Sequence, residues 1–457
     1  MIGILHKASA SEIPEVNADG EEAKNMDVFY DPSRKCYWIQ NARGGWIEVN
    51  ETSLSRQLIP CGFSRARNSG GLSPLEQELN DIQTEHDIFY AGPLAGHFAG
   101  FLEDHETRIL VTSSPKLIEP VPGEFPIFRQ FIENLLTDDA GDQLSHFYGW
   151  VKTGFECLWE RNLRSGQALV LAGKRGCGKS LLQKVLTLIF GNRDARPARY
   201  MKEGTNFNGE LIGAEHLIIE DDCASTKIAA RLAFGDHIKA VTSNELQSCH
   251  MKGRQAVGLR PCWRMSISLN DEAENLMILP PMDDHLLDKI ILLRAHKKPM
   301  PMPTTSMAER ALFWSTLESE LPAFLYWLTT IWEIPKELGS ERFGIKEFQN
   351  PDLMAALNDL SPEARLLRLI DAALFEPRKR GVGPVDPRER AWTGTAEKIE
   401  EMLIDSGYEK EVGKLLTWPG AAGTYLARLK NSRPDRVTKK RSAQERSWTL
   451  HPPVMTP

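Results

Sequence analysis

One stretch, LVLAGKRGCGKSLLQKVLTLIFG at Leu169–Gly191, constrains the fold of this chain more than any other. Gly173, Gly178, Lys179 and Ser180 fit the pattern G-x-x-x-x-G-K-S/T, in which backbone N–H groups wrap around phosphates. An apolar run precedes the motif and a Leu/Val pattern with helical spacing follows it, so we expect a loop between a buried strand and a helix N-terminus. The sequence therefore predicts an α/β fold that binds a nucleotide.

The residues of this loop have separate expected roles. Lys179 is expected to reach the β- and γ-phosphates of ATP, and the Ser180 hydroxyl is expected to ligate Mg²⁺. We assign the whole loop to nucleotide binding, namely Gly173, Lys174, Arg175, Gly176, Cys177, Gly178, Lys179, Ser180 and Leu181. A glycine turn that fits by chance is the alternative, and it does not account for the flanking strand and helix patterns.

A phosphate loop needs an acidic partner that holds Mg²⁺ and orients water, and EHLIIEDDCAS offers one about forty residues further on. An apolar strand is expected to end there at Glu220, Asp221 and Asp222. With the strand counted as His216–Ile219, Glu220 takes the metal position and Asp221 activates water. A shift of one residue would move both roles along, to Asp221 and Asp222, and a solvated acidic turn is the alternative.

A second apolar strand, WRMSISLN, ends at Asn270. An amide at this place can polarise the attacking water between the acidic residue and the γ-phosphate. Asn is also a common turn residue. The order of strand and Asn after the phosphate loop favours the catalytic interpretation.

Composition limits the remaining choices. The chain has 457 residues, 41% of them hydrophobic, and a formal net charge of −7, so any nucleic-acid binding must come from local basic patches. Its seven cysteines form no C-x-x-C pair, which disfavours a zinc site or a disulfide framework and fits a reducing cytoplasm. The most apolar segment, LPAFLYWLTTIW at 321–332, is too short to span a bilayer, so no membrane association is expected.

The order of phosphate loop, acidic strand end and Asn270 resembles a superfamily III helicase, a branch of the AAA+ ATPases. The chain also resembles, more broadly, the helicase half of phage and plasmid primase–helicases. The stretches that carry this resemblance are FYDPSRKCYWIQ near the N-terminus and ELPAFLYWLTTIWEIP after the expected ATPase core. The resemblance implies a homo-hexameric ring that acts on DNA in replication, with a separate primase or replication protein as a further partner. No primase activity is expected in this chain.

The resemblance also implies contacts outside the loop. The family carries a DNA-binding hairpin between the acidic strand and the Asn strand, and its expected tip here holds Lys252 and Arg254. DDHLLDKIILLR resembles the stretch that carries an arginine finger, but Lys289 stands where that arginine is expected. Lys289 and Arg294 are both candidates to reach a neighbour's γ-phosphate, and structural ion pairing is an equal alternative for each.

A basic region near the end of the chain is the other place where chemistry is visible. From Trp392 a helix, a second helix and two short extended pieces follow one another in an order that resembles a winged helix. This region also carries a local excess of Lys and Arg. A local excess of positive charge in an acidic protein is typical of nucleic-acid binding. The expected duplex contacts are Arg428, Lys430, Lys439, Lys440 and Arg441, and a solvated basic face is the alternative.

These patterns predict five regions. They are an N-terminal mixed α/β module at 1–125, a helical collar at 126–165, an AAA+ core at 166–299, a helical extension at 300–385 and a winged-helix-like domain at 386–457. The chain is expected to be an ATP-dependent DNA helicase of a mobile element. An AAA+ ATPase that loads or remodels partners on DNA is the main alternative, and a small-molecule kinase is a weaker one.

Overall fold

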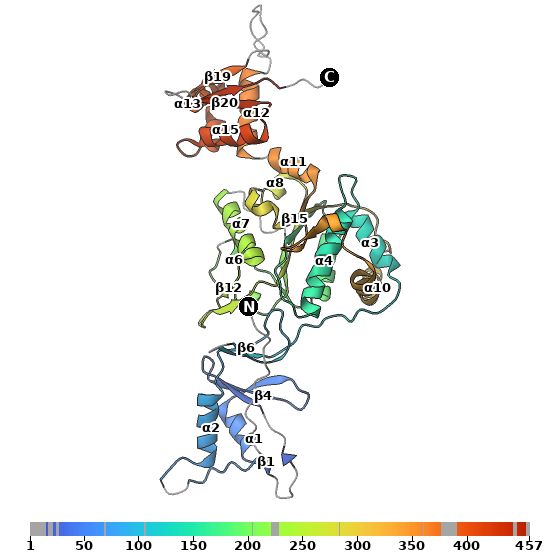
Figure 1. Ribbon diagram of the computed structural model, residues 1–457, viewed down its shortest axis with the longest axis vertical. Coiled ribbons are helices and arrows are strands. Elements are labelled where there is room, and N and C mark those ends of the chain that lie inside the picture. The colour runs from blue at the N-terminus through green and yellow to red at the C-terminus, as the bar shows by residue number, and fades with distance from the viewer. Residues whose placement is uncertain are drawn as a thin grey trace, which may run out of the picture. The chain divides into compact units, whose positions relative to one another are not determined.

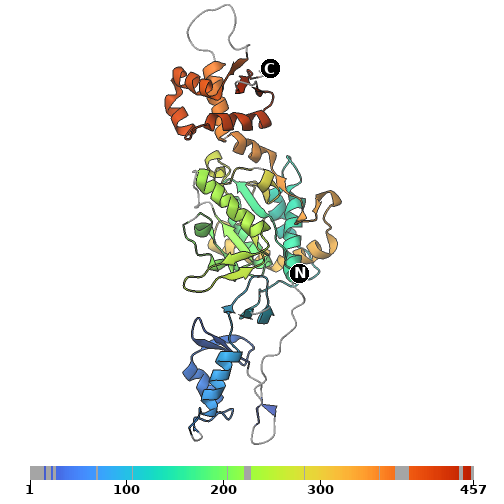
Figure 2. The same cartoon turned by 60° about the vertical axis from the view of Figure 1, so that its left-hand side comes forward.

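The computed structural model divides the chain into two compact units, Met1–Asn350 and Pro351–Pro457, called the N-terminal and C-terminal units below. Figure 1 labels the main elements and Figure 2 gives a second view. The structure describes residues 15–16, 22–23, 27–67, 70–104, 107–202, 204–220, 228–282, 284–359, 361–375, 391–441 and 446–453.

The N-terminal unit begins with two small sheets. Strands β1 (Glu15–Val16) and β2 (Glu22–Ala23) pair, and β3 (Val28–Asp31), β4 (Cys36–Gln40) and β5 (Trp46–Val49) form an antiparallel sheet. Helices α1 (Glu51–Leu58) and α2 (Pro74–Glu85) follow. Val28 and Tyr37 pack against both helices, and Tyr37 is almost fully buried. Tyr37 therefore serves as part of the core of this module.

A third small sheet joins this module to the core of the unit. It contains β6 (Tyr90–Gly92), β8 (Thr107–Val111) and β7 (Gly100–Asp104). Just beyond β6, the Gly96 N–H donates to the Glu215 carboxylate over 2.9 Å, and Glu215 also forms a buried ion pair with Arg193. Because a buried charge must be paired, this bridge fixes the sheet against the core.

The core is a six-stranded sheet in which every described pairing is parallel. In spatial order its strands are β10 (Asp194–Ala195), β11 (His216–Ile219), β14 (Arg264–Leu269), β9 (Ala168–Gly173), β15 (Ile290–Ala295) and β18 (Phe348–Gln349). Strand β9 is central and buried along its whole length, as expected for a parallel strand with both faces covered. The chain thus has a mixed α/β fold built on a parallel sheet.

Helices cover this sheet, with α7 (Ile228–Ser243) on one side and α4 (Gln143–Trp159) and α10 (Met307–Tyr326) on the other (Figures 1 and 2). Helices α3 (Pro126–Leu136), α4 (Gln143–Trp159), α5 (Lys179–Ile189) and α10 (Met307–Tyr326) share one hydrophobic cluster with β9 and β15. The remaining elements of this unit are α6 (Ala198–Met201), η1 (Gly209–Leu211), α7 (Ile228–Ser243), β12 (Gln247–Cys249), β13 (Val257–Leu259), α8 (Ala273–Leu276), α9 (Asp284–Leu287), η3 (Trp327–Ile331), η4 (Lys336–Leu338), β16 (Gly339–Ser340) and β17 (Gly344–Ile345).

The C-terminal unit packs helices against a small antiparallel sheet. Its elements are α11 (Pro351–Asp359), α12 (Pro362–Leu374), β19 (Trp392–Gly394), α13 (Ala396–Leu403), η6 (Ile404–Tyr408), α14 (Glu409–Leu415), α15 (Ala421–Ser432), β20 (Val437–Arg441) and β21 (Arg446–Leu450). The strand order is β19-β21-β20. Leu366 and Ile370 of α12 are buried in the same cluster as Leu426 of α15, so α12 is part of this unit's core. The segment 300–385, predicted as one extension, lies across the division between the two units.

Among the helices that the structure describes, none combines the length and the apolar character needed to cross a bilayer.

Candidate functional site

The phosphate-loop motif forms the turn between the central strand β9 and helix α5. Gly178 has φ 116° directly before the helix, a left-handed conformation that residues with a Cβ rarely adopt. A Cβ on Gly173 would lie 2.0 Å from the carbonyl oxygen of Ala295 on β15, so the close approach of the two strands requires glycine there. Two glycines of the motif are thus required by geometry.

The first turn of α5 is open to an anion. Among the described residues no side chain caps the helix, so within this part of the chain its first N–H groups have no side-chain acceptor. The partial positive charge of a helix N-terminus favours phosphate at this place. Ser180 is exposed in this turn, Cys177 is buried and Leu181 is half-buried, while Lys174, Arg175 and Gly176 are exposed in the loop.

Lys179 lies across the loop, and its side chain is largely buried. Its Nζ donates to the carbonyl oxygen of Gly173 over 2.5 Å and to that of Lys174 over 3.1 Å. The same nitrogen lies 3.5 Å from Oδ1 of Asn270. The lysine therefore joins the end of β9 to the end of β14.

Strand pairing explains why Asn270 reaches this place. Strands β14 and β9 run parallel, and Leu269 is the partner of Ala172 in their register. Asn270, the next residue, therefore follows β14 at the same edge of the sheet where Gly173 ends β9. The structure thus brings together Lys179 and Asn270, two site residues that the sequence predicts.

The acidic strand end is described as far as Glu220. Glu220 follows β11, and its carboxylate accepts a hydrogen bond from Arg196 over 3.0 Å. Asp221 and Asp222 lie outside the described residues, so the structure leaves the register of the acidic pair open. No group of three or more His, Cys, Asp or Glu side chains within the described part of the chain could hold a metal ion. A shared site with Ser180, one carboxylate and phosphate oxygens needs no such group.

A buried polar network holds β11 and β14 against α5. Gln183 Nε2 donates to the Ile219 carbonyl over 3.4 Å and to Ser266 Oγ over 3.0 Å. His216 contacts Thr187 Oγ1 through Nδ1 and Ser266 Oγ through Nε2, both over 2.8 Å. Burial lowers the pKa of His216 to about 3, so its ring stays neutral. The network sets the position of Glu220, since Ile219 directly precedes it.

The two finger candidates lie at opposite ends of β15. Arg294 pairs in register with Ala172, at the phosphate-loop end of the sheet. Lys289 precedes the strand at the other end, where its Nζ forms a 2.6 Å ion pair with Asp288 and donates to the His285 carbonyl over 2.8 Å. The ion-pairing alternative therefore describes Lys289 in this structure. The backbone of Arg294 is bound by the amide of Gln143.

The predicted DNA-binding hairpin is formed by β12 and β13, which pair antiparallel. Its turn is closed by a hydrogen bond from the Arg254 N–H to the Met251 carbonyl over 3.3 Å. Lys252 is exposed at this turn and Arg254 is half-buried.

The basic residues of the C-terminal unit differ in availability. Arg428 and Lys430 are exposed on α15, although Arg428 lies 3.7 Å from Glu363. Lys440 is exposed on β20, and Lys439 Nζ lies 4.7 Å from the ring centre of Trp448. The side chain of Arg441 lies outside the described residues.

Sequence reasoning missed Arg196 and Gln183, which act on the acidic strand end through contacts across the fold. Arg196 lies 24 residues before its partner Glu220, and Gln183 lies 36 residues before Ile219. A polar residue on the inner face of the α5 pattern was the one available signal for Gln183. No signal in the sequence identifies Arg196.

Comparison with known proteins places this geometry in context. Residues 171–284 match the model of a "Family of unknown function (DUF5906)". The chain is similar to the solved structure "The apo structure of NrS-1 C terminal region (305-718)", with a TM-score of 0.55 at 14% identity over 93% of this chain and 95% of that one. A second structure, "The A form apo structure of NrS-1 C terminal region-CTR", gives a TM-score of 0.54 at 13% identity over 94% and 96% of the two chains. No curated protein matches significantly.

Likeness at such low identity extends to the fold alone. A third structure, "SCCmec type IV Cch - active helicase", covers 95% of this chain and 79% of its own at 12% identity, but its TM-score of 0.29 is too low to support an argument. The first two comparisons show that the chain shares its fold with the NrS-1 C terminal region over nearly the full length of both.

Proposed function

We propose that this protein is an ATP-dependent DNA helicase of the superfamily III type that acts as a homo-hexameric ring in the replication of a mobile element. The observation that carries the proposal is the 3.5 Å approach of Lys179 Nζ and Asn270 Oδ1 at the end of the central strands. A phosphate-binding lysine and a water-polarising amide meet there beside an open helix N-terminus. This set of groups is suited to hydrolyse a phosphoanhydride.

The chain's own residues supply the steps of hydrolysis. The loop N–H groups and Lys179 bind the phosphates and stabilise the charge that builds up on the γ-phosphate. Ser180 and Glu220 would hold the metal, Asp221 accepts the proton of water, and Asn270 orients that water. Arg294 or Lys289 is the cation proposed to act on the neighbouring subunit's γ-phosphate.

The oxygen groups at the end of β11 and at the start of α5 fit Mg²⁺. Ser180 presents an exposed hydroxyl and Glu220 a half-exposed carboxylate, and hard divalent cations prefer such ligands. When bound, Mg²⁺ would neutralise charge on the β- and γ-phosphates.

Nucleic-acid contacts are proposed for both units. The hairpin of β12 and β13 carries Lys252 and Arg254 on a turn, and this supports a role in gripping a single strand inside the ring. The element order of the C-terminal unit, with α15 before the hairpin of β20 and β21, supports a winged-helix-like duplex-binding domain. A separate primase as partner, and a cytoplasmic location, stay predictions from the sequence.

The test measures ATP hydrolysis and strand separation on the same purified protein. We expect an ATPase that single-stranded DNA stimulates and that unwinds forked duplexes, with a hexameric mass when an ATP analogue is present. Hydrolysis by a ring that leaves forked DNA intact would move the assignment to an AAA+ ATPase that loads or remodels partners. Absence of both activities would overturn the proposal.

A further inference from the structure

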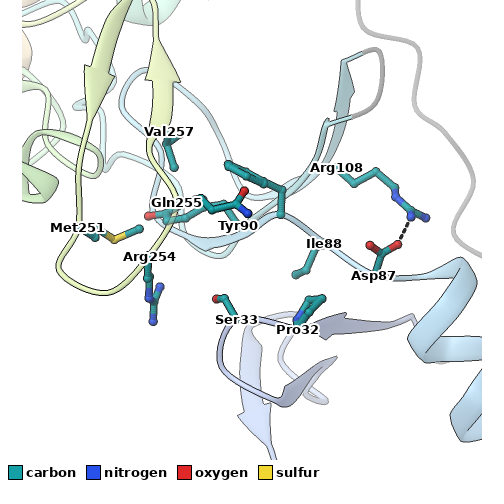
Figure 3. Close-up of a pocket in the computed structure, with 11 residues that line it drawn as sticks. Pro32, Ser33, Asp87, Ile88, Tyr90, Arg108, Met251, Arg254, Gln255 and Val257 are labelled. Carbon is teal, nitrogen blue, oxygen red and sulfur yellow. Dashed lines mark hydrogen bonds and ion pairs between the residues drawn. The ribbon is translucent and has the colours of Figure 1, made fainter.

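A pocket of about 410 Å³ lies within the N-terminal unit, between the tip of the β12–β13 hairpin, the turn that joins β3 to β4, and the sheet of β6, β7 and β8 (Figure 3). Its lining comes from four separate segments of the chain. These residues are Pro32, Ser33, Asp87, Ile88, Phe89, Tyr90, Arg108, Met251, Arg254, Gln255 and Val257. The volume falls within the range of about 300–1,000 Å³ that is typical of small-ligand sites.

The inner wall of the pocket is apolar and fixed. Ile88, Tyr90 and Val257 are all buried. The Tyr90 hydroxyl donates to the Pro93 carbonyl over 2.8 Å, and burial raises the pKa of this phenol to about 12. Tyr90 therefore contributes its ring to the wall and keeps its proton.

Phe89 differs from these neighbours because 37% of it remains exposed. Its backbone is fixed in the sheet, since its N–H donates to the Arg108 carbonyl over 2.8 Å. An exposed aromatic ring on a fixed backbone is a suitable surface for stacking a flat, apolar ring.

Among the described residues, the charged side chains that line the pocket differ in whether they have a partner. Arg108 forms an ion pair with Asp87, which cancels its charge. In the part of the chain that the structure describes, no hydrogen bond or ion pair engages the Arg254 guanidinium, which extends from the hairpin toward the turn that carries Pro32 and Ser33 (Figure 3). Gln255 adds an exposed amide, and Lys252 is exposed at the same hairpin turn. The pocket therefore favours an anion that also carries a planar ring.

We propose that this pocket binds one nucleotide of a single-stranded nucleic acid, with Arg254 on the phosphate and Phe89 stacked on the base. The proposal rests on the proposed function and deepens it, because it makes the N-terminal sheets part of the path of the strand. A duplex is excluded as occupant, since stacking on Phe89 needs a base that is free of its neighbours. A free mononucleotide has the same chemistry and is separated from a strand by the experiment below.

The test uses the full chain with a fluorescein-labelled oligothymidylate, Mg²⁺ and a non-hydrolysable ATP analogue, and measures fluorescence anisotropy. Loss of base stacking in Phe89→Leu is expected to raise the Kd by about fivefold to about a hundredfold. Phe89→Tyr keeps an aromatic face and is expected to retain the wild-type affinity. Leu72→Ala, which truncates an exposed apolar side chain elsewhere in the N-terminal module, is the control and should change nothing.

The outcomes separate the two proposals. Wild-type affinity in Phe89→Leu, with DNA-stimulated ATP hydrolysis intact, would overturn the pocket assignment and leave the helicase assignment standing. Failure of the wild-type protein to bind the oligonucleotide at all would overturn both. If thymidine monophosphate binds with a dependence on Phe89 while the oligonucleotide shows none, the site belongs to a free nucleotide and the strand assignment is wrong.

Discussion

Lys179 and Asn270 approach to 3.5 Å between Nζ and Oδ1, although 91 residues separate them in the chain. Each follows a parallel strand, and the register of Leu269 with Ala172 makes the two strands end at the same edge of the sheet. The lysine also binds the carbonyl that ends β9. An anion bound by Lys179 would therefore lie close to the side-chain amide of Asn270.

Removal of the lysine tests the phosphate role. In Lys179→Ala we expect ATP turnover to fall by at least about a hundredfold, because a preorganised cation is lost from the place where transition-state charge develops. A colorimetric phosphate assay measures this. Lys184→Ala removes an exposed lysine from the same helix and should keep turnover near wild type. Equal losses in both variants would contradict a specific role for Lys179.

Removal of the amide tests the water-positioning role. Asn270→Ala is expected to lower kcat by about a hundredfold to a thousandfold while nucleotide affinity stays the same, because the amide acts on the attacking water. Binding of a fluorescent ATP analogue and steady-state kinetics separate the two effects. A loss confined to binding would show that Asn270 merely supports the loop.

The register of the acidic residues can be settled by three amide variants, Glu220→Gln, Asp221→Asn and Asp222→Asn. We expect Glu220→Gln to raise the Mg²⁺ concentration needed for hydrolysis and Asp221→Asn to bind ATP without turning it over. Titration of Mg²⁺ against turnover is the measurement. Full activity in Asp221→Asn, together with an inactive Asp222→Asn, would move both roles one residue along.

The core of the site could be predicted because its signals are local. The glycines, the lysine and the flanking periodicity all lie within one strand–loop–helix unit, and Asn270 ends a strand that is apolar along its length. The contacts that tune the site could not be predicted in this way. The Arg196–Glu220 pair, the bond from Gln183 to Ile219 and the approach of Ala295 to Gly173 depend on strand order, which periodicity does not specify.

The local sequence pattern also could not predict how the helices that follow the parallel sheet pack together. Helix α12 looks like a continuation of the preceding helices, yet its buried face is completed by α13 and α15, which follow much later in the sequence. The same limit applies to Lys289. The sequence shows that Asp288 is its neighbour and can pair with it, but it does not show that Lys289 lies at the end of β15 remote from the phosphate loop.

His216 predicts a pH dependence of stability. Its folded pKa of about 3 lies below the ordinary value of about 6.5, so below that value the unfolded chain binds a proton that the folded chain does not. The free energy of unfolding must then fall as the pH drops from about 6.5 toward about 3, by on the order of 2 kcal/mol at about pH 5.

Urea unfolding at neutral and acidic pH measures this effect. His216→Gln should lose less stability on acidification than the wild type, although it starts from a lower value because the network with Thr187 and Ser266 is disturbed. His250→Gln changes an exposed ring and should keep the wild-type pH dependence. An unchanged pH dependence in His216→Gln would show that other groups control the acid response.

We expect duplex DNA to bind to the C-terminal unit. A truncation after Asn350 respects the boundary of the unit, whereas one before Trp392 would leave α12 without the helices that bury Leu366 and Ile370. Not every basic residue there can contact DNA, because the guanidinium of Arg436 is buried in an ion pair with Asp371. If about four of the remaining basic residues engage phosphates of B-DNA, the log–log salt slope of binding should be near about −3.6.

Fluorescence anisotropy across a salt series on the full chain and on the truncated chain measures this slope. Truncation should weaken duplex binding and flatten the slope. Lys439→Ala with Lys440→Ala should reduce the slope by about two, since each phosphate contact contributes about one. Lys410→Ala with Lys414→Ala removes the same charge from α14 of this unit and is the matched control. Equal effects in the two pairs would mean that net charge alone attracts DNA, and an unchanged slope after truncation would assign duplex binding to the N-terminal unit.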